Sequence, residues 1–155
     1  MKKLKIYVLS AVFLLVTIQT TFSQGITGKW KKSGQTTVYV NGKKTDSWTS
    51  LVKLQPCYAN IVYSFIAGGK MDENAAGCSE TVKKMLTSAV PKSNWKLSGN
   101  QLTITASDGS IPPAVYEISF SGNSMTWYFN YAANPAIPNI KARAQSMTIV
   151  YERVK

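Results

Sequence analysis

Few residues of this chain have the types and spacing that chemistry requires. The sequence contains no histidine, which excludes Ser-His-Asp and Cys-His nucleophile arrangements and most zinc and copper sites. The seven acidic residues are dispersed, and Asp72 and Glu73, the only adjacent pair, would alternate to opposite faces of a strand. No carboxylate pair of the glycosidase kind and no calcium-binding loop is indicated. We therefore expect no catalytic residue, no metal and no cofactor.

Two short motifs match enzyme signatures only in part. Residues 93–96 have the S-x-x-K spacing of penicillin-binding enzymes, but they begin a predicted strand rather than a helix, and no K-T-G triplet follows. The segment Gly68-Gly69-Lys70 lacks the spacing of a phosphate-binding loop. Both are better explained as chance matches.

The first 23 residues have the pattern of an export signal. Three lysines precede an apolar run of 13 residues at positions 6–18, and small residues follow. A run of that length is too short to span a bilayer comfortably. We expect cleavage between Ser23 and Gln24, export to a periplasm or beyond, no stable membrane insertion, and one domain over residues 24–155.

The two cysteines of the chain predict one disulfide. Cysteines in a small exported domain are usually paired, and joining Cys57 to Cys78 closes a loop of about 22 residues. In the chain-entropy model such a bond stabilises the fold by about 3 kcal/mol.

The charge of the chain is strongly basic but scattered. Residues 24–155 carry a net charge of +8, from 15 lysines and arginines against 7 acids. Such a balance could attract nucleic acid or an anionic surface. The basic residues form no continuous track and no exposed stacking platform is evident. We therefore interpret them as a solvated surface and expect no nucleic-acid partner.

Short β-rich runs separated by turn residues fill most of the chain. Asn41-Gly42 is a strong hairpin signal, and similar Gly and Asn turns recur at regular spacing. An up-and-down order without a long crossover favours a barrel over a sandwich. The predicted strands are residues 26–32, 36–40, 48–54, 61–66, 70–73, 94–97, 101–106, 115–120, 124–131 and 142–154.

One segment, residues 80–89, has the period of a helix instead. Ser79 is placed to cap its start, and Pro91 follows its end. We expect a short amphipathic helix that packs on the barrel or over one end of it. Its apolar residues recur at i, i+3, i+4 and i+7, at positions Val82, Met85, Leu86 and Ala89.

Gly28 and Trp30 form a Gly-x-Trp on the first predicted strand, and Arg153 lies on the last. These residues near the two ends of the predicted domain resemble those of the calycin barrels, the lipocalins and fatty-acid-binding proteins. A family pattern of Cys, F-x-x-x-G and Cys is matched by the residues Cys57, Phe65, Gly69 and Cys78.

The chain is similar to the secreted bacterial lipocalin-like domain families over nearly all of residues 24–155. This resemblance implies an all-β, up-and-down antiparallel barrel of eight strands with one short helix. It also implies that Trp30 plugs one end of the barrel while Arg153 lies across the indole, a geometry that a cation–π contact stabilises.

Strand alternation then predicts which side chains face inward, because Arg153 must point toward Trp30. Arg143 stands ten residues earlier, about 33 Å away along an extended strand. It would lie at the opposite mouth, where its guanidinium could hold a carboxylate; alternatively, it points into water at the start of the strand. The candidate lining residues are Tyr63, Phe65, Tyr116, Ile118, Trp127, Phe129, Arg143 and Met147.

These residues predict a monomeric carrier of a small hydrophobic or amphiphilic ligand, with acids among the candidates. Two alternatives stay open. A barrel filled by its own side chains would instead suit a non-catalytic envelope or extracellular interaction or inhibitor module. A barrel cyclase would use the same apolar interior to steer a reactive intermediate.

Overall fold

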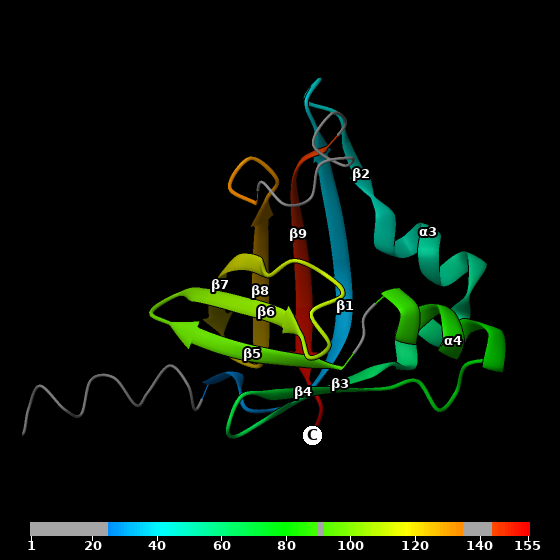
Figure 1. The fold of residues 1–155 in the computed structure, drawn as a ribbon. Coiled ribbons are helices and arrows are strands. Elements are labelled where there is room, and N and C mark those ends of the chain that lie inside the picture. Colours follow the sequence, from blue (N-terminus) through cyan, green and yellow to red (C-terminus); the bar gives the residue numbers. More distant parts are fainter. Residues whose placement is uncertain (1–24, 90–91, 135–143) are drawn as a thin grey trace, which may run out of the picture.

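An antiparallel sheet that closes on itself dominates the computed structural model (Figure 1), which describes residues 25–89, 92–134 and 144–155. The predicted signal peptide and Pro91 lie outside these residues. The elements are β1 Gly28–Tyr39, β2 Lys44–Asp46, α3 Ser47–Leu54, η1 Pro56–Asn60, β3 Val62–Ile66, β4 Lys70–Asn74, α4 Glu80–Ala89, β5 Ser93–Ser98, β6 Gln101–Ala106, β7 Ala114–Ser121, β8 Ser124–Asn130 and β9 Ala144–Arg153.

Eight of these strands form the barrel. Strands β3 to β9 pair in chain order, and β1 pairs with β3 on one side and with β9 on the other. The remaining strand, β2, pairs with the second half of β1. The predicted up-and-down antiparallel barrel of eight strands is confirmed, although it carries two short α-helices rather than one.

Strand β1 is longer than predicted. The sequence predicts two strands, at residues 26–32 and 36–40, but the backbone continues through the polar segment between them. The register against β9 shifts between Lys32 and Gly34, so Ser33 has no residue directly opposite it on β9. This β-bulge bends the strand so that it follows the curvature of the barrel. Along one edge, β1 pairs first with β3 and then with β2.

The predicted strand at residues 48–54 is wrong, because this segment forms helix α3. The Asn41-Gly42 turn is present, with Gly42 donating to the Tyr39 carbonyl at 2.8 Å. After the short strand β2, however, the Asp46 side chain accepts from the Thr49 amide at 3.0 Å and caps a helix. The N-cap therefore decides against the β-forming composition of this segment.

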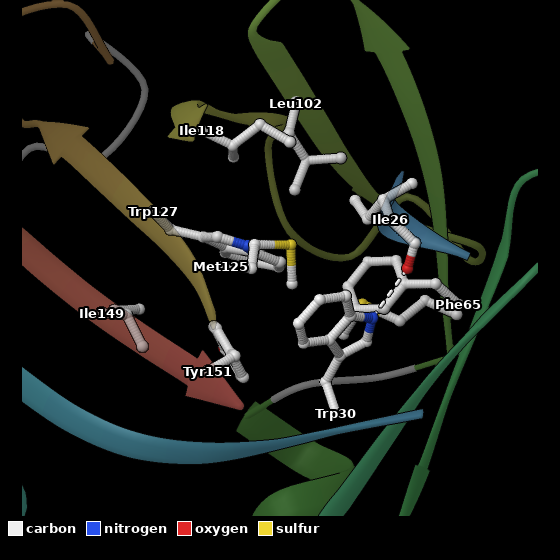
Figure 2. Close-up of a cluster of buried hydrophobic side chains, with 10 residues drawn as sticks. Ile26, Trp30, Phe65, Leu102, Ile118, Met125, Trp127, Ile149 and Tyr151 are labelled. Atoms are coloured by element: carbon white, nitrogen blue, oxygen red, sulfur yellow. Dashed lines mark hydrogen bonds between the residues drawn. The ribbon is translucent and has the colours of Figure 1, made fainter. Parts of the chain in front are cut away.

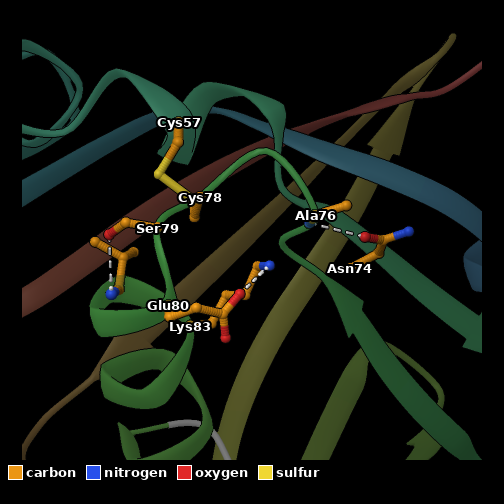
Figure 3. Close-up of polar contacts among 8 residues, drawn as sticks. Cys57, Asn74, Ala76, Cys78, Ser79, Glu80 and Lys83 are labelled. Carbon is orange, nitrogen blue, oxygen red and sulfur yellow. Dashed lines mark hydrogen bonds and ion pairs between the residues drawn. A yellow bond between two sulfur atoms is a disulfide. The ribbon is translucent and has the colours of Figure 1, made fainter.

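Helix α4 and the disulfide agree with prediction. Ser79 Oγ accepts from the Val82 amide at 3.4 Å at the start of α4, and Cys57 is bonded to Cys78 (Figure 3). Val82 and Leu86 are buried against Ile61 and the disulfide, although Met85, expected on the same face, is 58% exposed. Both helices lie on one side of the barrel, beside β1 and β3 (Figure 1).

The seam between β4 and β5 is the shortest ladder of the barrel. Only two residue pairs join these strands, and α4 is inserted between them in the chain. The Gly69 turn reinforces the seam, because its carbonyl accepts from the Trp95 amide at 2.6 Å, and the Lys70 carbonyl accepts from the Trp95 indole at 2.9 Å.

Gly69→Ala should destabilise the fold more than Gly68→Ala. Both glycines have positive φ, so either alanine is strained by about 1–2 kcal/mol. A Cβ at Gly69 would also meet the Trp95 carbonyl oxygen at 2.8 Å, whereas a Cβ at Gly68 meets nothing within 4 Å. We expect urea unfolding to show at least about 1 kcal/mol of further loss for Gly69→Ala. Equal losses would show that the seam tolerates the added methyl group.

Candidate functional site

Trp30 and Arg153 are paired where the first and last strands meet and pack against each other, and we call this contact the Trp30 seal. Trp30 is fully buried, and its indole nitrogen donates to the Ile26 carbonyl at 2.7 Å (Figure 2). The Arg153 guanidinium lies 4.3 Å from the centroid of the Trp30 ring, and it donates to the carbonyls of Thr27 and Gly25 at 3.0 and 2.5 Å. The contact predicted from the two ends of the domain is thus present.

The motif glycine makes room for this arginine. Gly28 has a φ of 129°, and a Cβ there would lie 2.8 Å from Arg153 Nη1. In the Gly-x-Trp motif, Trp30 therefore supplies the ring, and Gly28 leaves the space for the guanidinium that packs on it.

Directly paired residues of neighbouring strands point to the same face, so the register shows which side chains share the interior. Beginning at the seal, Trp30 pairs with Tyr63, which pairs with Glu73. Three further inward rows are Phe120–Met125–Tyr151–Lys32, Ile118–Trp127–Ile149–Gln35 and Phe129–Met147–Thr37.

The described members of the predicted lining set come together inside the barrel. Trp127 is central, because the centroid of its ring lies 5.7 Å from that of Phe65 and 4.8 Å from that of Tyr151, residues that Figure 2 also draws. The Tyr116 ring lies 4.9 Å from it. Tyr63 joins through Tyr151, at 5.5 Å. The remaining members contact or pair with these residues. The Phe129 ring contacts the Tyr116 ring, Met147 is paired with Phe129 across β8 and β9, and Ile118 is paired with Trp127 across β7 and β8.

Arg143, the predicted partner of an acidic group, lies outside the described residues. A register shift also separates Ser146 from Ala144 on β9, opposite Val38 and Tyr39. Gln145, which simple alternation places inward, is exposed. The alternation counted from Arg153 therefore does not extend past residue 146.

Two charged residues that sequence reasoning missed face the interior beside these rings. Lys32 is paired with Tyr151, and Glu73 with Tyr63. Parity from Trp30 could have indicated Lys32, which stands two positions later on the same strand. With the tyrosines and the tryptophan they form what we call the interior polar cluster: Lys32, Tyr63, Glu73, Trp127 and Tyr151.

Burial controls the ionisation of this cluster. Loss of solvent lowers the pKa of Lys32 to about 8, although attraction to Glu73 opposes the change. Burial raises the pKa of Glu73, with Lys32 opposing part of that rise. Burial also raises the pKa of Tyr151 well above its usual value, and that of the adjoining Tyr116 to about 12. The tyrosine hydroxyls therefore stay protonated at neutral pH.

Two buried polar atoms of the cluster have no hydrogen-bond partner. They are the indole nitrogen of Trp127 and Oε2 of Glu73. Lys32 makes no hydrogen bond to that oxygen; its ammonium donates to Gln35 Oε1 and lies 5.2 Å from the centroid of the Trp48 ring. Buried polar atoms are nearly always paired, so this donor and this acceptor mark the part of the interior suited to a polar ligand group.

A comparison with protein families agrees with this architecture. The model of the lipocalin-like domain matches residues 26–127. The chain belongs to the lipocalin-like domain family. The match runs from the residues before β1 to Trp127 in β8, so the closing strand β9 lies beyond it. No curated protein and no solved structure matches the chain.

The lipocalin-like fold suggests binding of a small hydrophobic ligand, and such domains are generally non-catalytic. Among the described residues of this lipocalin-like domain, no three His, Cys, Asp or Glu side chains gather as a metal site. No helix in the described ranges is long and apolar enough to cross a membrane.

Arg153→Lys should weaken the seal of the lipocalin-like barrel. Lysine keeps a charge over the Trp30 ring but lacks the fork that reaches both carbonyls. We expect the free energy of unfolding in urea to fall by about 1–2 kcal/mol, while Glu152→Gln on the outer face changes it little. An unchanged value for Arg153→Lys would show that the two carbonyl contacts add no stability.

Lys32→Met should remove a pH dependence of stability. Between pH 8 and 10.5 the folded protein has released the Lys32 proton while the unfolded chain still holds it, so stability rises with pH across this window. Relative to Lys32→Met, the wild type should gain about 3 kcal/mol, at 1.36 kcal/mol per pH unit. The outward-facing Lys31→Met should keep the wild-type rise. Parallel curves for wild type and Lys32→Met would contradict a desolvated ammonium.

Proposed function

We propose that this lipocalin-like domain is an exported, non-catalytic protein that binds a small hydrophobic or amphiphilic molecule inside its barrel. One observation carries the proposal. Several inward residues, among them Trp30, Phe65 and Met125, are buried, whereas Tyr63, Tyr116 and Met147 point inward and are only half-buried. Apolar area that remains accessible on the inner face is area that a ligand can cover.

Burial would supply the binding energy. Removing about 200 Å² of apolar surface from water is worth about 5 kcal/mol, before the losses of ligand and side-chain freedom are subtracted. The proposed lining consists of Tyr63, Phe65, Tyr116, Ile118, Trp127, Phe129 and Met147, with Arg143 as the proposed partner of an acidic group at the mouth.

Export is supported by the first 23 residues and by the disulfide. The lysines and the apolar run at positions 6–18 have the signal-peptide pattern. The Cys57–Cys78 bond is of a kind that persists in oxidising compartments. We propose that the exported protein begins at Gln24 and is a monomer.

The aromatic contacts of the interior favour one rival function. Rings from Phe65 through Trp127 to Phe129 and Tyr131 touch in sequence, as they would in a barrel filled by its own side chains. Such a barrel would act as an interaction or inhibitor module through its outer surface, and it would hold no ligand.

Binding should depend on space at Met147. We expect a neutral fluorescent probe such as N-phenyl-1-naphthylamine to bind with increased emission, and Met147→Trp to lower its affinity at least about tenfold by filling the interior. Thr148→Trp, which adds the same ring to the outward face of β9, should leave the affinity unchanged.

Native mass spectrometry of the exported protein completes this test. The proposal predicts a mass starting at Gln24 plus a bound species that organic extraction releases. Absence of any bound species, together with no probe binding by wild type, would support the filled barrel instead.

A further inference from the structure

The interior polar cluster contains one donor and one acceptor that are buried without a hydrogen-bond partner in an otherwise largely apolar interior. Trp127 is 3% exposed and its indole nitrogen has no partner. Oε2 of Glu73 has none either. Tyr151 and Tyr63 connect the two residues, through ring contacts of 4.8 and 5.5 Å and the pairing of Tyr63 with Glu73. The donor and the acceptor therefore belong to one continuous inner surface.

The two ionisable residues of the cluster that can carry charge near neutral pH have opposite signs. Lys32 and Glu73 both face the interior and attract one another in their charged forms, so the cluster offers no excess of one charge to a ligand. A carboxylate entering it would be repelled by Glu73, and an ammonium would be repelled by Lys32. Each would also lose its hydration on entering this buried interior, and the attraction between Lys32 and Glu73 leaves neither of them as a dedicated counter-charge for a ligand.

Uncharged hydrogen-bonding groups avoid both costs. A hydroxyl both accepts and donates, so hydroxyl groups can satisfy an indole N–H and a carboxylate oxygen without bringing charge into the barrel. The apolar remainder of such a molecule suits Phe65, Ile118 and Ile149, which lie beside the cluster.

We propose that the interior polar cluster selects a neutral, hydroxyl-bearing apolar molecule, with Trp127 Nε1 donating to it and the Glu73 carboxylate accepting from it. This inference rests on the proposed carrier function, and it names the ligand class of that same interior. It competes directly with an acidic ligand held by Arg143.

The test compares head groups on one chain length. Displacement of N-phenyl-1-naphthylamine at pH 7 would be measured for 1-dodecanol, dodecanoate and dodecylammonium, each below its micellar concentration. We expect dodecanol to bind at least about tenfold more tightly than either ion, because of the desolvation and repulsion that the ions meet.

Trp127→Phe separates binding from folding. It removes an indole N–H that has no partner in the free protein, so no hydrogen bond of the fold is lost, although the smaller ring gives up packing contacts and lowers thermal stability. The folded variant should bind dodecanol about fivefold more weakly, whereas the affinity for N-phenyl-1-naphthylamine, which carries no hydroxyl, should change less. Trp95→Phe is the matched control, since its indole already donates to the Lys70 carbonyl. That variant should lose thermal stability and keep its dodecanol affinity.

Glu73→Gln tests the acceptor. It removes the negative charge that faces the ligand, so dodecanoate should bind more tightly and the preference for dodecanol should shrink at least about threefold. Glu117→Gln, at an exposed carboxylate on the outer face of β7, should change neither affinity.

The outcomes separate the two levels of the proposal. If wild type binds neither the fluorescent probe nor any of the three amphiphiles, the carrier function fails and this inference fails with it. If dodecanoate binds as tightly as dodecanol, or if Trp127→Phe leaves dodecanol affinity unchanged, the assignment is overturned while the carrier function stands.

Discussion

The contact of the Arg153 guanidinium with Trp30 is the interaction on which the rest of the barrel depends. It joins the first strand to the last and provides donors for two carbonyls ahead of β1. Gly28 leaves room for this contact because it has no side chain, and any larger residue would place atoms where the guanidinium lies. A closed barrel has no sheet edge left to pair with another chain except where a strand runs past its neighbour, and here β2 covers that part of β1.

Closure also fixes the chemistry of the interior. Once Trp30 faces inward, the register of β1, β3 and β4 places Tyr63 and Glu73 on the same face, and β9 brings Tyr151 next to Lys32. The seal and the interior polar cluster are therefore successive layers of one structure. Polar atoms that would be solvated on an open sheet are held among aromatic rings, which accounts for the lowered pKa of Lys32 and the raised pKa of Glu73.

The predictable parts of the fold are those whose cause is local or periodic. Turn residues and strand alternation predict most of the strands, and the 3.6-residue period predicts α4. The pair of cysteines predicts the Cys57–Cys78 bond, whereas the eight-stranded barrel and the choice of the inward face depend on the family resemblance at Trp30 and Arg153. Helix α3 was missed because its β-forming composition concealed the Asp46 cap. Glu73 was missed for a different reason: its environment is created by Lys32 and two tyrosines that are distant in sequence. The β-bulge at Ser33 is not predictable from its polar segment, because no residue pattern there distinguishes a bulge from a break between two strands.

The disulfide has a consequence for the hairpin of β3 and β4. Cys57 precedes β3 and Cys78 follows β4, so the bond clasps this hairpin at the end opposite its Gly68-Gly69 turn (Figure 3). Tyr63 and Glu73, which are paired across this hairpin, lie between the two constraints. Reduction of the Cys57–Cys78 bond would remove the covalent constraint at that end of the hairpin. The arrangement of the polar groups in the barrel is thereby linked to the Cys57–Cys78 bond, which is of a kind that persists where conditions are oxidising.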